Sequence, residues 1–352
     1  MRGEREKKKI PKKFILWGAV ALFVGIFLLI AGPYYAFTTQ DLKISLLRTL
    51  FTSGGLRKVN NQVSILVLGI AGGTHDGPTL SDSIIVANYN FEKNRVITIG
   101  IPRDVWSSTL RDKINSAYAY GEAKKENGGL TLAKAEVGAI VGFPIEYAVV
   151  INFSKYKGLI DFFGGVNVNV ANTFVDHKYP LEGKEDDLCG GDPDYKCRYE
   201  TIQFNQGLQH MDGATALKYV RSRNAIGAEG SDFARSKRQQ LVTEDLKSKI
   251  LSTLFSMNVD KTKKLYAVLN DSVQRDVDNQ QVASLIKNVI FNGHFYQKDF
   301  AYPRELFVTP DVSSYDGRYV LIPKNGYANL HDYTQCILTK ESESACAYLE
   351  KN

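Results

Sequence analysis

Four arginines gather in one short stretch of the chain, residues 219–240, which reads YVRSRNAIGAEGSDFARSKRQQ. They are Arg221, Arg223, Arg235 and Arg238. A guanidinium group stays charged and binds two phosphate oxygens at once. Phosphoryl transfer needs such groups, because charge on the non-bridging oxygens must be neutralised while the reacting groups are held in line. The stretch therefore suggests a clamp for a small polyanion, with a nucleic-acid patch or a solvated helix face as alternatives.

The spacing of these residues predicts that they converge. A helix beginning near Asp232 would carry Asp232, Arg235, Arg238 and Gln239 on one face, at i, i+3, i+6 and i+7. Arg221 and Arg223 point the same way in extended chain. The amino end of the helix adds partial positive charge. We assign catalytic roles to Arg221, Arg223, Asp232, Arg235 and Gln239 and substrate binding to Arg238; a solvated face for Arg238 and an N-cap for Asp232 are the alternatives.

A second cluster follows a strongly apolar run, in the sequence IPRDVW of residues 101–106. Arg103 and Asp104 come at the end of an expected buried strand, where site residues often lie. We assign both to catalysis, with an ion pair at the sheet edge as the alternative. Lys113 and Asn115 precede an expected helix, and we assign them to substrate binding, with exposure to solvent as the alternative for Lys113.

A glycine-rich loop, AGGTHDGPTLSD, joins two expected strands and contains Asp76 and Asp82. Carboxylate oxygens of this kind bind Mg²⁺ together with substrate phosphates. The loop lacks the GxxxxGK[ST] pattern, so it is not a P-loop. We expect Mg²⁺ as the cofactor, with Asp82 and Asp76 as its ligands; simple turn roles are the alternatives.

The amino terminus predicts a membrane anchor. Seven basic and two acidic residues within positions 1–13 precede an uncharged run at residues 14–32. Nineteen helical residues nearly span a hydrocarbon core of roughly 30 Å. The basic flank places the amino terminus in the cytoplasm and the remainder outside, in a single-pass cell-membrane protein. A cleaved signal peptide is the alternative.

This topology changes the meaning of the net charge. The whole chain has 44 basic and 38 acidic residues, so positions 14–352 retain 37 and 36. A nearly neutral outer part excludes a generally basic nucleic-acid binder. The expected parts are a basic tail at 1–13, the anchor at 14–37, a stem at 38–60, a catalytic domain at 61–257 and a packed C-terminal extension at 258–352.

The four cysteines fall into two close pairs, Cys189 with Cys197 and Cys336 with Cys346. Outside the membrane, oxidation is the default. Metal binding is the alternative, but the chain has no C-x-x-C motif and no histidine at ligand spacing. We therefore expect two disulfides.

Hydrophobic patterning predicts an α/β fold. Runs rich in β-branched residues indicate strands near 63–69, 83–89, 95–101, 147–153 and 166–170. Helices are expected near 115–123, 131–141, 155–163, 212–221 and 233–255, around a polar excursion at 172–207. The weaker C-terminal signals indicate a helix at 278–291, a strand at 315–322 and a helix at 327–338. Strands mixed with helices imply a mixed central sheet sandwiched by helices.

Together these motifs resemble the LytR-CpsA-Psr family, over roughly residues 60–250. The resemblance is carried by ILVLGI, LSDSIIVAN, VITIGIPRD, KINSAYAYGE, FFGGVNVNV, LQHMDGATALKYVRSR and SDFARSKRQQ, in that order. It implies an extracytoplasmic phosphotransferase that uses Mg²⁺ to move a glycopolymer from a polyprenyl-pyrophosphate carrier onto peptidoglycan. The family's clamp corresponds to Arg103, Arg221, Arg223, Arg235 and Arg238, its glutamine to Gln239, its metal-site aspartate to Asp82 and its other acidic residue to Asp232.

The chain departs from the family pattern at Ala71, where an acidic residue is usual, and at Leu80, where arginine is frequent. We expect Asp76 to replace the missing carboxylate. The family fold implies a hydrophobic groove for the polyprenyl chain, and residues 149–153 and 159–163 are its candidate walls, with ordinary core packing as the alternative. A carboxylate, Asp104 or Asp232, would deprotonate the acceptor hydroxyl. The rival functions are a polyprenyl-pyrophosphate hydrolase and a non-catalytic membrane-anchored binder of wall or lipid phosphates.

Overall fold

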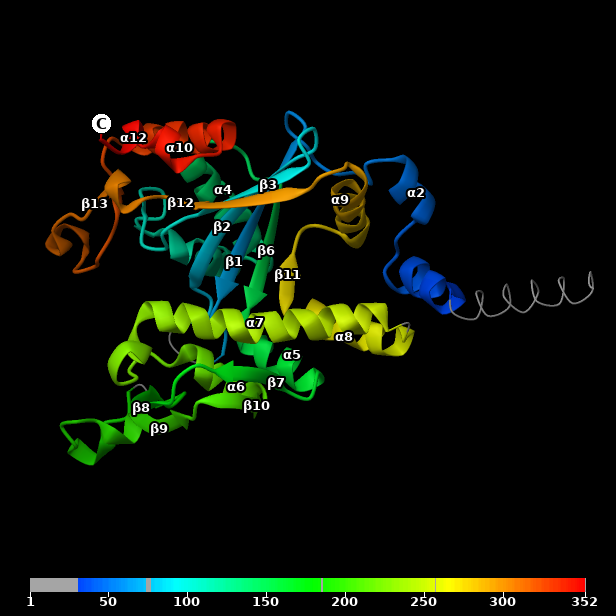
Figure 1. The fold of residues 1–352 in the computed structure, drawn as a ribbon. Helices are drawn as coiled ribbons and strands as arrows, with labels where there is room; N and C mark the ends of the chain where they lie inside the picture. The colour runs from blue at the N-terminus through cyan, green and yellow to red at the C-terminus, as the bar shows by residue number, and fades with distance from the viewer. Residues whose placement is uncertain (1–30, 74–76, 185, 257, 352) are drawn as a thin grey trace, which may run out of the picture.

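The computed structural model describes residues 31–73, 77–184, 186–256 and 258–351 (Figure 1). Residues 14–30 of the expected anchor (14–37) lie outside these ranges, as does Asp76. Within them, no helix combines the length and the apolar character that crossing a bilayer requires.

A six-stranded mixed sheet forms the centre of the fold, in the order β11-β6-β1-β2-β3-β12. Its strands are β1 (Gln62–Ile70), β2 (Ser81–Asn90), β3 (Arg95–Gly100), β6 (Tyr147–Asn152), β11 (Val273–Arg275) and β12 (Tyr296–Ala301). β1 runs parallel to β6 and antiparallel to β2, and β3 runs antiparallel to β2 and parallel to β12. The carboxyl ends of β1, β3, β6 and β12 therefore lie at the same end of the sheet, beside the start of β2.

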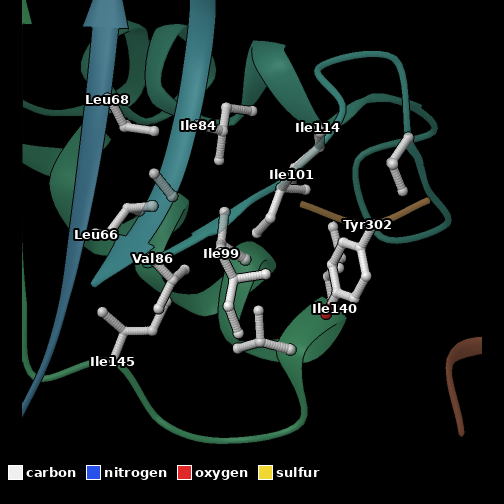
Figure 2. Close-up of a cluster of buried hydrophobic side chains, with 14 of the residues drawn as sticks. Leu66, Leu68, Ile84, Val86, Ile99, Ile101, Ile114, Ile140, Ile145 and Tyr302 are labelled. Carbon is white, nitrogen blue, oxygen red and sulfur yellow. The ribbon is translucent and has the colours of Figure 1, made fainter. Parts of the chain in front are cut away.

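One face of the sheet carries the larger apolar core. Alternate residues of each strand point the same way, so β1 contributes Leu66 and Leu68, and β3 contributes Ile97 and Ile99. They pack with Ile140 and other residues of helices α3 (Ala117–Lys124), α4 (Gly128–Val141) and α10 (Tyr327–Lys340). Figure 2 shows this cluster between the strands and the helix that carries Ile140.

The opposite face of the sheet is less completely covered. Ile65 and Val67 of β1, Ile85 of β2, and Val149 and Ile151 of β6 are only partly buried. These side chains alternate with the fully buried ones, and Ile65 and Val149 pack against a third buried cluster, formed by Leu56, Val63, Tyr147 and Val277. The expected sandwich is thus a mixed sheet flanked by helices, with one face packed more tightly than the other.

A second core lies beyond the end of the sheet (Figure 1). Its helices are α5 (Tyr156–Phe162), α6 (Gly213–Arg221), α7 (Asp232–Phe255) and α8 (Val259–Asp271). Its strands are β7 (Val166–Val170), β8 (Phe174–Pro180), β9 (Tyr199–Phe204) and β10 (Gly207–Met211), in the pairs β7–β10 and β8–β9. In Figure 1, α7 runs along the boundary between the two cores.

The C-terminal region is built into the central sheet. Its β11 pairs with β6, and β12 pairs with β3, so both sheet edges come from beyond residue 258. A buried ion pair between Arg95 of β3 and Glu341 fastens the region after α10 to the sheet. The expected helices near 278–291 and 327–338 are confirmed as α9 (Asn279–Phe291) and α10.

The strand expected at 315–322 is wrong. That stretch contains the end of a 3-10 turn (Val312–Tyr315) and reaches only into the two-residue strand β14 (Ile322–Pro323), which pairs with β13 (Phe307–Val308). Asp316 and Gly317 both have positive φ there, which ends extended chain. The remaining short elements are α2 (Leu46–Phe51), β4 (Trp106–Ser107), β5 (Asp112–Lys113), α11 (Glu343–Cys346) and α12 (Tyr348–Lys351).

The cysteines lie in the two expected pairs. The sulfur atoms are 2.04 Å apart in Cys189 and Cys197 and 2.09 Å apart in Cys336 and Cys346. The first pair lies in the long excursion between β8 and β9, and the second joins α10 to α11.

Candidate functional site

Five of the expected residues contact one another in sequence at the end of the sheet where β1, β3, β6 and β12 finish. We call them the strand-end group: Asp82, Arg103, Asp104, Lys113 and Asn115. An Arg103 guanidinium nitrogen lies 2.5 Å from Oδ1 of Asp82, and its Nε lies 3.8 Å from Oδ2 of Asp104. Lys113 Nζ donates to Oδ1 of Asp104 at 2.7 Å. The Asn115 backbone N–H donates to the Arg103 carbonyl at 3.3 Å.

Local structure explains why these side chains meet. β3 ends at Gly100, and a turn closed by the Val105 N–H on the Pro102 carbonyl exposes Arg103 and leaves Asp104 partly buried beside it. The β4–β5 hairpin then pairs Trp106 with Lys113, which returns the lysine to Asp104. The alternating charges hold one another in position beside a surface hollow of about 340 Å³ that Asp82 and Arg103 help to line.

A second group lies where α6 ends, in residues 221–224, which we call the arginine turn. Arg221 and Arg223 are exposed on either side of the fully buried Ser222. The Ser222 hydroxyl donates to Oδ2 of Asp176 at 2.7 Å, and the Asn224 N–H donates to the same oxygen at 3.1 Å. The fixed middle of the turn therefore sets the direction of both arginines.

Asp176 is a positioning residue that the sequence did not indicate. It is fully buried in β8, and its Oδ1 also accepts from the Lys178 N–H at 2.9 Å. Buried carboxylates are rare unless their oxygens are hydrogen-bonded. A single aspartate within a polar excursion gives no local sign of burial, so only the β8–β9 pairing could have revealed it.

Arg238 has a different place from the one expected. Its side chain is 3% exposed and donates to the carbonyls of Tyr219, Ser222 and Glu229, at 3.0, 2.8 and 2.8 Å. It also pairs with the Glu229 carboxylate at 3.0 Å and lies over the Phe174 ring. Its N–H groups donate to protein carbonyls, so Arg238 stabilises the arginine turn from within the core and does not face a ligand. The expected substrate contact is corrected to a supporting role.

Helix α7 carries the other expected residues. Arg235 is half-buried and Gln239 is exposed, one helical turn apart on the same side. Asp232 begins α7, and its side chain lies outside the described part of the structure. The N-cap alternative for Asp232 is wrong, because Ser231 is the cap and accepts from the Ala234 N–H. The expected single face holds for Arg235 and Gln239 but not for Arg238.

Two tyrosines next to the arginine turn report its electrostatics. Burial raises the pKa of Tyr179, while the nearby charge of Arg221 lowers it in part. Burial likewise raises the pKa of Tyr219, which Arg238 partly offsets. Both phenols therefore stay neutral at physiological pH, and the Tyr219 ring centroid lies 5.9 Å from the Arg238 guanidinium carbon.

The expected residues thus gather into two groups, one at the strand ends and one at the arginine turn and the start of α7. Figure 1 shows α7 running across the end of the sheet toward which the arrows of β1 and β6 point. The first group supplies two cations and two carboxylates, and the second supplies three cations and an amide. Each group can neutralise charge on phosphate oxygens, and the Asp82 carboxylate can hold a metal ion.

Residues 38–298 match the model of the LytR_cpsA_psr family, which is most of the chain. The chain belongs to this family. Curated relatives include polyisoprenyl-teichoic acid–peptidoglycan teichoic acid transferases named TagU. One from Bacillus cereus is 29% identical over 67% of this chain and 70% of its own, and one from Oceanobacillus iheyensis is 25% identical over 82% and 84%.

Solved structures of similar fold include B. subtilis TagV, with a TM-score of 0.47 and 22% identity, over 80% of this chain and 99% of that one. B. subtilis TagU has a TM-score of 0.45 and 19% identity, over 81% and 98%.

The family resemblance singles out Asp82 as a metal ligand, and its surroundings fit that role. Its carboxylate is about half exposed, at the mouth of the strand-end hollow. Mg²⁺ commonly binds one or two carboxylates and completes its shell with water and substrate phosphate. Another acidic cluster, Asp187 with Cys189 and Cys197, does not fit a metal, because its two cysteines are paired with each other.

We predict that Asp176→Asn weakens both the fold and the site. Asparagine has one acceptor oxygen, so either the Lys178 N–H or the Ser222 and Asn224 donors lose their partner. The free energy of unfolding should fall by about 1–3 kcal/mol. The rate of glycopolymer transfer to peptidoglycan should also fall, because Arg221 and Arg223 shift. Urea unfolding measures the first effect and a transfer assay the second. Asp194→Asn, an exposed change in the same excursion, is the control; equal stability of the two variants would contradict the assignment.

Proposed function

We propose that this protein is an extracytoplasmic phosphotransferase that moves a glycopolymer from a polyprenyl-pyrophosphate carrier onto peptidoglycan. Its curated relatives are named for the transfer of teichoic acid from a polyisoprenyl carrier to peptidoglycan. The observation that carries the proposal is the placement of the strand-end group, where Arg103 and Asp82 meet beside the surface hollow.

In the proposed mechanism, Arg103, Arg221 and Arg223 bind the non-bridging oxygens of the pyrophosphate. Mg²⁺ on Asp82 would neutralise further charge on the same phosphates. A hydroxyl of the acceptor sugar attacks the phosphorus nearest the polymer and forms a new P–O bond. The bond from that phosphorus to the bridging oxygen breaks, and polyprenyl phosphate leaves with that oxygen. A carboxylate takes the hydroxyl proton.

Asp104 and Asp232 are the candidate bases. Asp104 accepts a hydrogen bond from Lys113 Nζ at Oδ1, and its Oδ2 lies 3.8 Å from Nε of Arg103. This arrangement suits a carboxylate that orients Lys113 and Arg103 toward phosphate. Asp232 begins α7 at its amino end, on the same helix as Arg235 and Gln239. Lys113 and Asn115 would contribute to substrate binding from the strand-end side.

The polyprenyl chain is proposed to lie on the partly covered face of the sheet. Val149 and Ile151 are half-buried there, and Phe153 is 41% exposed and covers Gly69, where a Cβ would meet its ring at 2.7 Å. The other candidate wall fits less well, because Leu159 and Ile160 are buried in the second core. Residues 149–153 therefore remain the proposed wall, and core packing, the alternative for 159–163, holds because Phe162 and Phe163 also pack against the second core.

The protein is proposed to sit in the cell membrane through residues 14–37, with the amino terminus in the cytoplasm. On that topology the strand-end group faces the compartment in which peptidoglycan lies. The same compartment favours disulfides between Cys189 and Cys197 and between Cys336 and Cys346. Their sulfur atoms lie within bonding distance.

The decisive experiment supplies the purified full chain in vesicles with a polyprenyl-pyrophosphoryl sugar, Mg²⁺ and peptidoglycan. We expect the sugar phosphate to become covalently attached to peptidoglycan, as detected by mass spectrometry after digestion. Release of free sugar phosphate without attachment would identify a hydrolase. Saturable binding of the lipid without turnover would identify a non-catalytic receptor.

We predict that Asp82→Asn weakens the response of this reaction to Mg²⁺. Loss of the carboxylate charge weakens metal binding and leaves Arg103 without its 2.5 Å partner. Titration of Mg²⁺ in the transfer assay should show a large rise in the concentration needed for half-maximal rate. Asp76→Ala tests whether the loop supplies a second ligand. An unchanged Mg²⁺ dependence in Asp82→Asn would contradict the site, and the same result in Asp76→Ala would remove only Asp76.

A further inference from the structure

Helix α2 (Leu46–Phe51) packs with its polar side inward and its apolar side outward. Leu47, Leu50 and Phe51 are 71%, 57% and 81% exposed. Soluble helices normally show the reverse arrangement, with the apolar stripe facing the core. An exposed apolar face of this kind marks an interaction site.

The inward side of α2 is held by specific polar contacts with α9. The Ser45 N–H donates to Oε1 of Gln280 at 2.7 Å, and Nε2 of Gln280 donates to Thr49 Oγ1 at 2.7 Å. Lys287 Nζ donates to the Thr52 carbonyl at 3.1 Å. Gly54 has positive φ and lies so close to Ser284 that a Cβ would meet its Oγ at 2.0 Å. These contacts fix the orientation of α2, so the outward direction of its leucines is built in.

Helix α9 extends the same apolar surface. Ile286 and Ile290 lie one turn apart and are 53% and 65% exposed, and Phe291 at the end of the helix is 73% exposed. Figure 1 shows α9 next to α2, on the side of the molecule where the described chain begins. We call the exposed side chains of the two helices the α2–α9 surface: Leu47, Leu50, Phe51, Ile286, Ile290 and Phe291.

The chain around this surface is basic. Residues 42–61 contain Lys43, Arg48, Arg57 and Lys58 and no acidic residue. All four are exposed. Apolar side chains flanked by Lys and Arg are typical of helices that lie in the interface of an anionic bilayer. Arg57 lies 3.8 Å from the Asp276 carboxylate, so Lys43, Arg48 and Lys58 are the cations that favour a membrane carrying anionic lipids.

We propose that the α2–α9 surface rests in the outer interface of an anionic lipid bilayer and orients the catalytic domain against it. The inference depends on the proposed membrane anchor. The expected anchor, residues 14–37, ends nine residues before Leu46 begins α2. A connection of that length keeps α2 close to the point where the anchor would leave the membrane.

The test places a nitroxide label in the full chain, reconstituted into vesicles of phosphatidylcholine with phosphatidylglycerol. Leu50→Cys and Ile290→Cys report on the proposed surface. Leu208→Cys is the matched control, because Leu208 is 76% exposed on β10. Wild-type protein treated with the same reagent measures background labelling. Accessibility to dissolved oxygen and to a water-soluble nickel complex is read by electron paramagnetic resonance.

We expect the labels at 50 and 290 to show oxygen-to-nickel accessibility ratios several-fold above that at 208, and smaller ratios in pure phosphatidylcholine. Nickel accessibility equal to that at 208 would overturn the proposal. So would label immobilisation that rises with protein-to-lipid ratio, which would identify a second copy as the occupant. Failure of the chain to float with vesicles would instead refute the anchor, and with it the docking. None of these readouts requires transfer activity.

Discussion

Arg221→Ala is expected to lower kcat/KM for transfer by about 10²–10³, by analogy with the loss of one donor to a charged transition state. Arg221 is exposed at the end of α6, and its neighbour Ser222 is held by Asp176 and Arg238. The Arg221 side chain contributes little to the stability of the fold, so the variant should remain folded. The variant should therefore show a higher activation free energy for transfer and an unchanged free energy of unfolding.

The measurement compares initial rates of covalent attachment to peptidoglycan for wild type, Arg221→Ala and Arg221→Lys. Lysine keeps the charge but not the bidentate geometry, so only partial rescue is expected. Lys93→Ala is the control: it removes an exposed cation from the β2–β3 turn, at the opposite end of the sheet. Full transfer activity in Arg221→Ala would refute the proposed clamp, provided that thermal unfolding matches that of wild type.

The strand-end group could be predicted because it depends on local signals. Alternating or continuous apolar runs mark β1, β2, β3 and β6, and polar residues directly after a strand must emerge at its end. The antiparallel pairing of β2 with β3, which sets Ile85 opposite Gly100, then brings the start of β2 beside the end of β3. Arg103 and Asp82 accordingly meet, although they are far apart in sequence.

The arginine turn could be predicted only in part, because helical spacing shows which residues share a side but not what that side meets. Arg238 follows Arg235 by three residues, yet its guanidinium enters the core between α6 and the 3-10 turn Gly227–Gly230. Its burial depends on carbonyls from the preceding turn and on the Phe174 ring from β8. Such partners come from tertiary structure, so no sequence window contains them.

The edge strands were missed for a similar reason. β12 has the sequence YQKDFA and β11 has only three residues, VQR, so neither shows strong apolar periodicity. An edge strand gains its stability from backbone hydrogen bonds to a neighbour, and charged residues are common on it. The sequence alone therefore does not predict the pairing of β12 with β3.

Arg238→Leu is expected to lower the free energy of unfolding by about 3 kcal/mol, the lower end for breaking one partner of a buried ion pair. The lower end applies because the Glu229 side chain remains 19% exposed and keeps some water. The substitution removes the donors to three carbonyls and the contact with the Phe174 ring. Urea unfolding should show a lower midpoint at unchanged slope.

The matched control is Lys237→Leu, which removes the adjacent but exposed cation from the same helix. It should change stability by less than about 0.5 kcal/mol. Transfer kinetics distinguish a supporting role of Arg238 from a substrate-binding role. A supporting residue acts through the positions of Arg221 and Arg223. If Arg238→Leu keeps wild-type stability but raises KM for the lipid substrate, then Arg238 contacts the substrate and the support role is wrong. If stability and kcat fall together and Glu229→Gln reproduces part of both losses, the buried pair is what aims the arginine turn.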